Sequence, residues 1–327
     1  MKNFDAAMRC LAMLLTVYST AVAAQGAADF PSRPVILVLP YPPGGASDPE
    51  IRLYAQKLTE NTGAQFLVEN RPGAGTTIGM AYVMKAAPNG HTLLALNSTI
   101  SVIPLIYKDF AYDAARSLVP IVQMSARSSL LLVNASLPVQ NVREFVAHAR
   151  ANPGKLNYGT SGVGGITHLV AEWFKEASGS DITVVQYKGT GPMTTDMLAG
   201  RVHIGMGSVL PSKPYINSGK LRMLAASGAE RIRILPELPT IAEQGVPGFD
   251  FTQWSGFAAT GATPAAIVTK LNTEMVRVAR DPVIAKKLED DGYNMVGSTP
   301  DQLRKHIAAE TTRWRKLIES TGIKLEE

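Results

Sequence analysis

The chain has 327 residues, a length typical of about two domains. Hydrophobic residues make up 46% of it and charged residues only 18%, so each domain has enough apolar residues for a core of its own. Lysine and arginine (32) exceed aspartate and glutamate (27) by five. This composition excludes a disordered, collagen-like or coiled-coil chain.

The N-terminal residues 1–24 have the features of a secretory signal peptide. Basic residues precede an apolar stretch at 11–17, and Ala21–Ala23 forms a cleavage site of the small-x-small type. A membrane anchor is the alternative, but this stretch is shorter than the roughly 20 apolar residues that span a bilayer. We therefore expect export to the periplasm, with cleavage near Ala23.

Cleavage at this place also removes Cys10, the one cysteine of the chain. The mature protein then has no thiol, which excludes disulfides, cysteine–metal sites and a cysteine nucleophile. The five histidines lack the short spacing of metal ligands, and Gly73–Gly75 with Gly79 lacks the spacing of a dinucleotide-binding loop. We predict neither a metal nor a cofactor.

The recurring pattern is a buried strand, a glycine-rich loop and an amphipathic helix. The first unit has an apolar run at 35–39, the loop 40–48, and apolar residues at helical spacing over 51–58. Asp48 before Pro49 predicts the helix start, with the Asp48 carboxylate as its cap. A continuous apolar run is typical of a strand in a sheet that is covered on both faces.

The same unit recurs along the chain. Further strands are predicted at 65–68, 92–96, 156–159, 183–186 and 204–207, and helices at 77–86 and 168–177 and in a segment ending at Gly200. Strands that alternate with helices predict an α/β fold with mainly parallel sheets.

Two places interrupt this alternation and predict a hinge. The apolar runs 121–124 and 130–133 have no helix between them, and 254–259 is a further apolar run before a helix to about Arg280. Two crossing segments predict a discontinuous first lobe and a second lobe, with two sequential domains as the alternative. The predicted boundaries are 30–127 plus 252–327 for lobe 1 and 128–251 for lobe 2.

The glycine-rich loops predict an anion-binding site. In open parallel sheets ligands bind at the carboxyl ends of strands, where these loops lie. Glycines let backbone N–H groups turn toward a ligand, and the next helix N-terminus adds partial positive charge. The alternative is that the glycines only form tight turns. The candidate hydroxyl donors are Ser47, Thr76, Thr77, Ser98, Thr160, Ser161 and Thr167.

Signatures of catalysis and of nucleic-acid binding are missing. The sequence has no phosphate-binding P-loop motif, and Gly159–Val163 does not fit the nucleophile-elbow pattern. His168, at the start of a helix beside a loop, is the one histidine that we keep as a candidate for the site. The basic C-terminal helix is interrupted by Glu310 and Glu319, which is typical of a solvated face, and we predict no nucleic-acid partner.

Six motifs together resemble one protein family. They are Pro42–Asp48, Val68–Gly75, Pro88–Leu94, Tyr158–Leu169, Tyr187–Pro192 with Asp196–Gly200, and Leu235–Gly248. Their order and spacing, over essentially the whole mature chain, resemble the extracytoplasmic solute receptors of the tripartite tricarboxylate transporter family, the Bug proteins.

The resemblance implies a two-lobed periplasmic-binding-protein fold of type II, a Venus flytrap, and a function without catalysis. A monomer would capture a small carboxylate (a di- or tricarboxylate, an aromatic carboxylate or an amino acid) and deliver it to membrane permease subunits. In the family, backbone N–H groups, hydroxyls and bridging waters hold one carboxylate. The corresponding residues here are Tyr41, Gly44, Gly45, Ala46, Ser47, Asp48, Gly75, Thr76, Thr77, Asn97 and Ser98 in lobe 1, and Thr160, Ser161, Gly164, Thr167, His168, Tyr187, Lys188 and Gly189 in lobe 2.

The sequence departs from the family pattern at three positions. His203 stands where the family usually has aspartate, Gly207 where a larger residue is common, and Thr76 where it has a glycine. We expect these changes to remove negative charge and bulk near the ligand. Of the two cations in the loops, Arg71 is expected at the outer edge, whereas Lys188 is expected to hold the far end of the ligand.

One enzymatic alternative stays open. An exported hydrolase acting on a carboxylate ester would use the hydroxyl of Thr160 or Ser161. The missing nucleophile–base signature counts against this alternative.

Overall fold

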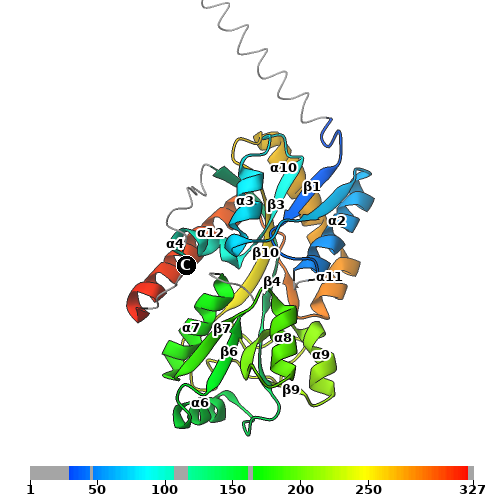
Figure 1. Cartoon of the computed structure of the whole chain (residues 1–327). Coiled ribbons are helices and arrows are strands. Elements are labelled where there is room, and N and C mark those ends of the chain that lie inside the picture. The colour runs from blue at the N-terminus through cyan, green and yellow to red at the C-terminus, as the bar shows by residue number, and fades with distance from the viewer. Residues whose placement is uncertain (1–28, 45–46, 107–116, 161–164, 323–327) are drawn as a thin grey trace, which may run out of the picture.

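Two β-sheets organise the part of the chain that the computed structural model describes, residues 29–44, 47–106, 117–160 and 165–322 (Figure 1). The segment predicted as a signal peptide lies outside these residues. Helices cover both faces of each sheet. No helix in the described ranges combines the length and the apolar character needed to cross a membrane.

The first sheet has six strands in the order β11-β4-β10-β3-β1-β2. The strands are β1 (Val35–Leu39), β2 (Phe66–Asn70), β3 (Thr92–Asn97), β4 (Leu118–Ser128), β10 (Thr252–Thr260) and β11 (Tyr293–Met295). The helical elements of this lobe are α2 (Asp48–Thr62), η1 (Ala74–Thr76), α3 (Thr77–Met84), η2 (Ser98–Ser101), α4 (Ile103–Ile106), α10 (Ala265–Ala279), α11 (Pro282–Glu289) and α12 (Pro300–Thr321).

The second sheet has five strands in the order β7-β6-β8-β5-β9. The strands are β5 (Leu130–Asn134), β6 (Leu156–Thr160), β7 (Ile182–Gln186), β8 (Ile204–Gly207) and β9 (Leu221–Ala226). Its helices are α6 (Val142–Ala151), α7 (Ile166–Ser178), α8 (Thr190–Leu198) and α9 (Val209–Asn217).

The chain crosses between the sheets twice, from β4 into β5 and from the segment after β9 into β10. The strands that precede the glycine-rich loops pair in parallel: β1 with β2 and β3, and β6 with β7 and β8. The crossing strands β4, β5 and β10 pair antiparallel with their neighbours, and β11 pairs antiparallel with β4. The predicted α/β fold with two lobes and two crossings is confirmed.

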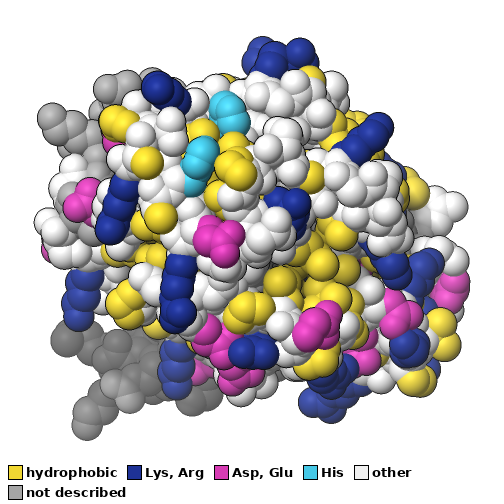
Figure 2. All heavy atoms as spheres, turned by 90° about the horizontal axis from the view of Figure 1, so that it is seen from below, with side chains coloured by type: hydrophobic (Ala, Val, Ile, Leu, Met, Phe, Trp, Pro, Cys, Tyr) yellow, Lys and Arg dark blue, Asp and Glu magenta, His cyan; other side chains and the backbone are white. Residues whose placement is uncertain are grey.

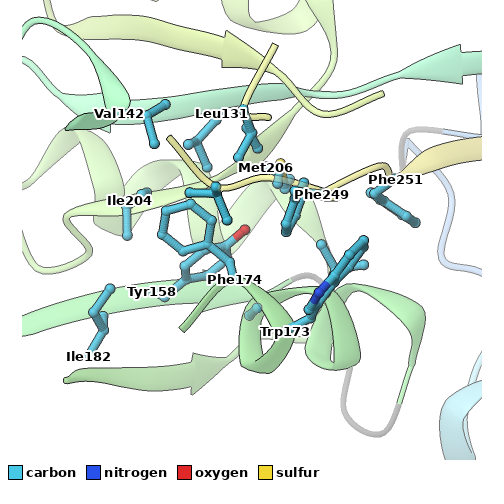
Figure 3. Packing of buried hydrophobic residues seen from close by; sticks show 14 of the residues in the cluster. Leu131, Val142, Tyr158, Trp173, Phe174, Ile182, Ile204, Met206, Phe249 and Phe251 are labelled. Atoms are coloured by element: carbon cyan, nitrogen blue, oxygen red, sulfur yellow. The ribbon is translucent and has the colours of Figure 1, made fainter. Parts of the chain in front are cut away.

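The core of the second lobe reaches into the C-terminal helix. Trp173 of α7 stacks on Phe249 with ring centroids 4.3 Å apart, and it meets Trp314 of α12 edge-on at 5.7 Å. Figure 3 shows Trp173 and Phe174 beside Phe249 in this cluster. The sequence analysis placed all of 252–327 in the first lobe, whereas Trp314 packs in the core of the second. The reason is the length of α12, which begins against the first-lobe core and extends past the hinge.

Candidate ligand-binding site

The strand register places the predicted site loops at the ends of the two sheets where the chain crosses between them. In the first sheet Asn97, at the end of β3, pairs with Ser255 of the crossing strand β10. In the second, Gly207 at the end of β8 pairs with Leu130, the first residue of β5. We call 41–48, 73–77 and 97–98 the first-lobe loops, and 160–167 and 187–189 the second-lobe loops. Their described residues lie at the ends of the sheets that face the other lobe.

Asp48 organises the first of these loops. Its Oδ2 accepts hydrogen bonds from the Gly44 N–H (3.2 Å) and Arg52 Nε (3.0 Å), and its Oδ1 accepts from Asn70 Nδ2 (3.1 Å). Burial alone would raise the pKa of Asp48, but these donors outweigh it and hold the pKa below its usual value. The predicted cap role is wrong, because the N-cap of α2 is Ser47, which makes no side-chain cap bond, and Asp48 already lies inside the helix.

The bonds of Asp48 make the N-terminus of α2 a poorer anion-binding site than the N-termini of other helices. The Gly44 N–H is committed to Asp48, and the first turn of α2 carries two acidic residues. The helices α3, α7 and α8 carry no acidic residue in their first turn and no side-chain cap bond. Their N-termini therefore keep the partial positive charge that α2 neutralises itself.

Tyr41 joins two first-lobe loops. Its hydroxyl donates to Asn97 Oδ1 (2.9 Å) and lies 3.1 Å from Thr99 Oγ1. Asn97 Oδ1 also accepts from the Thr99 N–H (3.0 Å) and so caps η2. Burial raises the pKa of Tyr41, which keeps its hydroxyl a proton donor. The sequence predicted Tyr41 and Asn97 but missed Thr99, which only the fold brings to them.

Ser98 ties the third loop to a crossing strand. The side chain is buried, and its Oγ accepts a hydrogen bond of 3.0 Å from the N–H of Trp254, 156 residues away in β10. The sequence analysis expected this hydroxyl for the ligand. In the structure its bond to β10 gives it a structural role.

The loop before α3 has an unusual backbone. Gly73, Ala74, Gly75 and Thr76 follow one another with φ values of +129°, +42°, +58° and +88°. A β-branched residue at such an angle is strained. The Thr76 side chain is buried, and the Thr77 hydroxyl donates to Ala74 O within the loop (2.8 Å).

Arg71 lies beside this loop and has partners of its own. Its guanidinium stacks over the Tyr82 ring, 3.6 Å from the ring centre, and pairs with Glu69 at 2.5 Å. These contacts fit the structural role that the sequence analysis expected for Arg71.

The second-lobe loops contain a hydroxyl and a cation without partners in the described residues. Thr160 is buried, and its Oγ1 makes no hydrogen bond there, so no described base contacts it. Lys188 is exposed and makes no ion pair with a described residue. Gly189, the N-cap of α8, follows with φ +129°.

Tyr187 is held by its own lobe. Its hydroxyl donates to Asp196 Oδ2 (2.7 Å), and Asp196 pairs with Arg201 at 2.5 Å. Desolvation, together with the bond to Asp196, raises the pKa of Tyr187 to about 12. The hydroxyl therefore stays protonated and bonded within the second lobe.

His168 has a structural environment. It is buried in α7, with Nε2 at 3.9 Å from Glu172 and the ring nitrogens 3.4 Å from the Gln186 amide. Thr167 lies half-buried in the first turn of the same helix. The four other predicted site residues, Gly45, Ala46, Ser161 and Gly164, lie outside the described residues.

Two of the three departures from the family pattern do not act as expected. His203 lies just before β8, at the end of the strand away from the second-lobe loops, where its Nδ1 accepts from the Asn157 N–H (2.9 Å). It is therefore at the opposite end of β8 from the second-lobe loops. Gly207 does lie at the loop end, but a Cβ there would meet Leu132 Cδ1 at 2.5 Å and Ser212 Oγ at 2.8 Å. These side chains already fill the space.

Charge on the surface is mixed on the face that Figure 2 shows. Basic and acidic side chains alternate with neutral surface there and do not gather into one patch. Among the described residues no group of three or more histidine, aspartate or glutamate side chains is placed to hold a metal ion.

Comparison with known proteins identifies the family. The family described as "Tripartite tricarboxylate transporter family receptor" matches residues 51–323. BugT of Bordetella pertussis is 32% identical, over 97% of this chain and 99% of its own.

Solved structures agree with this match. A Rhodopseudomonas palustris protein solved with adipate is 38% identical, with a TM-score of 0.86 over 90% of this chain and 99% of its own. MatC of the same species, with bound malate, is 27% identical, with a TM-score of 0.82 over 88% and 100%. The chain therefore belongs to the tripartite tricarboxylate transporter receptors, a family of periplasmic solute-binding proteins.

Proposed function

We propose that this protein is a monomeric, non-catalytic periplasmic receptor, exported with cleavage near Ala23, that binds a small dicarboxylate and delivers it to permease subunits. The ligand lies between lobe 1 (30–127 plus 252–327, with the end of α12 packed on the other lobe) and lobe 2 (128–251). The observation that carries the proposal is the position of the loops, which follow parallel strands at the facing ends of two sheets. The relatives solved with adipate and with malate, both dicarboxylates, support this ligand class.

The near carboxylate binds to the first-lobe loops. The Gly44 N–H is bonded to Asp48, and the N–H groups of Thr76 and Thr77 are bonded to Gly73 O and Ala74 O. Of these four groups, the Gly75 N–H, just before α3, is therefore the donor left for the ligand. Tyr41 and Asn97 border the same place as a joined pair. A neutral network of this kind holds a carboxylate by hydrogen bonds and does not need a salt bridge.

The far carboxylate binds to the second-lobe loops. Lys188 supplies a cation that makes no ion pair among the described residues, and α8 starts beside it without an acidic residue in its first turn. Thr160 Oγ1 supplies a buried hydroxyl that no described residue uses. A ligand with a second carboxylate gains these contacts, whereas a monocarboxylate does not.

Titration calorimetry tests the proposal after a thermal-shift screen of mono-, di- and tricarboxylates and amino acids. A ligand at 100 times its dissociation constant stabilises the fold by about 2.7 kcal/mol. We expect Lys188→Ala to weaken binding of the best dicarboxylate about tenfold, which is about 1.4 kcal/mol, and to leave a monocarboxylate of equal length unaffected.

The matched control is Lys155→Ala, an exposed lysine at the other end of the same sheet. If the wild type and Lys188→Ala bind every screened carboxylate with the same dissociation constant, Lys188 does not have this role. Turnover of carboxylate esters by the purified protein would favour the hydrolase instead.

A further inference from the structure

A contact beside the hinge joins the two lobes through Asp291, which lies between α11 and β11 of the first lobe. Its Oδ1 accepts a hydrogen bond of 2.5 Å from the backbone N–H of Leu210, the second residue of α9 in the second lobe. The Asp291 side chain is 14% exposed. Leu210 is an exposed residue, so the bond itself is accessible to water although the Asp291 side chain is mostly covered.

Asp291 caps the N-terminus of α9, which is normally done by the N-cap residue of the helix itself. The N-cap of α9 is Ser208, which makes no side-chain cap bond, and the first turn of α9 has no acidic residue. A capping acceptor bonds the N–H of the second or third helical residue, which is the position of Leu210. The carboxylate also meets the positive end of the helix dipole. The second-lobe helix is thus capped from the first lobe.

The cation nearest to Asp291 in its own lobe is committed elsewhere. Arg127 of β4 is 4.0 Å from Asp291, at the limit of an ion pair. The same guanidinium donates to the Tyr293 hydroxyl at 2.5 Å and to Gln253 at 3.3–3.4 Å. The bond to α9 is consequently the shortest polar contact of Asp291.

Further contacts between the lobes surround the Asp291 bond. Arg233 pairs with Glu289 at 2.8 Å across the two lobes. A Cβ on Gly292 would lie 3.2 Å from Ile232 and 3.4 Å from Val209, so the turn before β11 lies directly on the second lobe. Figure 1 shows α11 and α9 on the same side of the molecule.

A cavity next to these contacts leaves room for movement. It measures about 230 Å³ and is lined by Ser128 and Thr252 of the crossing strands, by Tyr293 of β11, and by residues 229–234 of the second lobe. Because its walls come from both lobes and from the hinge, rotation about the hinge changes its shape. A change in the angle between the lobes would therefore alter this cavity and the Asp291 contact together.

We propose that Asp291 is an interlobe latch: by capping α9 it holds the lobes at the angle of this structure and opposes their closure on the ligand. The latch rests on the proposed function, because closure requires a ligand between the lobes. A ligand must then break the Asp291 cap as it draws the loops together, and part of its binding free energy is used in doing so. Removing the latch makes the closed state easier to reach.

The test compares Asp291→Ala with Asp290→Ala. Asp290 is the adjacent carboxylate, 53% exposed and paired with Lys286 of α11, so it controls for lost charge. Without ligand, small-angle X-ray scattering should give a smaller mean radius of gyration for Asp291→Ala than for the wild type or the control. Calorimetry with adipate or malate, whichever stabilises the wild type, should show about threefold to tenfold tighter binding.

Unchanged scattering with unchanged or weaker affinity would overturn the latch. If neither adipate nor malate binds the wild type, the proposed ligand class fails, and the scattering comparison alone decides the latch. Circular dichroism checks that Asp291→Ala is folded. Should it not fold, Asp291→Asn retains an acceptor oxygen without the charge, and it should shift both readouts the same way but less.

Discussion

At the scale of single residues, several side chains that were predicted to contact the ligand make hydrogen bonds that hold the loops in place. Asp48 bonds Gly44 and Asn70, and Ser98 bonds β10. A loop that binds through backbone N–H groups must have those groups fixed before the ligand arrives, since ordering them on binding would cost affinity. We therefore expect these residues to affect ligand affinity by holding the loop backbone in position.

Ser98→Ala should lower stability more than affinity. The change leaves the buried N–H of Trp254 without its acceptor, which costs about 1–3 kcal/mol. Urea denaturation measures the loss. The exposed Ser218, which bonds only Tyr215 O, gives the control Ser218→Ala, for which we expect a change within about 0.5 kcal/mol. Full stability with abolished binding would show that Ser98 contacts the ligand.

The site could be predicted from the sequence as a set of loops, but not bond by bond. Glycines after apolar runs located the loops, because strand and loop signals are local. The partner of Ser98 lies 156 residues away, and Tyr41 meets Thr99 across 58 residues. Such pairings follow from sheet order, which local patterns do not contain. For the same reason His203 was expected near the ligand but lies at the far end of its strand.

At the scale of secondary structure, buried strands were predicted better than edge strands and proline-containing helices. The run 35–39 coincides with β1, and 204–207 with β8, because both are continuous and covered on each side. Of the four edge strands, β9 and β11 were missed, whereas β2 and β7 were predicted at 65–68 and 183–186. The helix α9 was missed because its interior contains Pro214, which breaks the usual helical pattern.

The loop that opens α3 gives a prediction at this scale. Thr76 has φ +88°, a backbone angle that glycine adopts without strain and that strains a residue with a Cβ. We expect the free energy of unfolding to be about 0.5–1 kcal/mol higher for Thr76→Gly than for Thr76→Ala, as measured by urea denaturation. At Thr195, exposed within α8, the order of the same two substitutions should reverse. The same order at both positions would contradict the strain at Thr76.

At the scale of the whole molecule, the lobes are joined by more than the two crossing strands. The helix α12 begins in a first-lobe cluster through Leu303 and ends in the second-lobe core through Trp314. On the other side of the hinge, Asp291 reaches α9. Lobes tied at both sides of a hinge can rotate only by rearranging these contacts, so the resting angle and the ease of closure are set outside the ligand site.

The C-terminal helix provides the last prediction. Trp314 is 1% exposed, and its ring packs against Trp173 and Phe251 of the second-lobe core. Trp314→Ala should cost about 3–5 kcal/mol through the cavity that it leaves. The lost contacts lie in the second lobe, while the start of α12 stays on the first. We therefore expect differential scanning calorimetry to show one transition for the wild type and two for Trp314→Ala. The neighbouring exposed Arg315 gives the control Arg315→Ala, which should keep one transition near the wild-type midpoint. One transition shifted as a whole in Trp314→Ala would mean that the crossing strands alone couple the lobes, and that α12 adds stability without joining them.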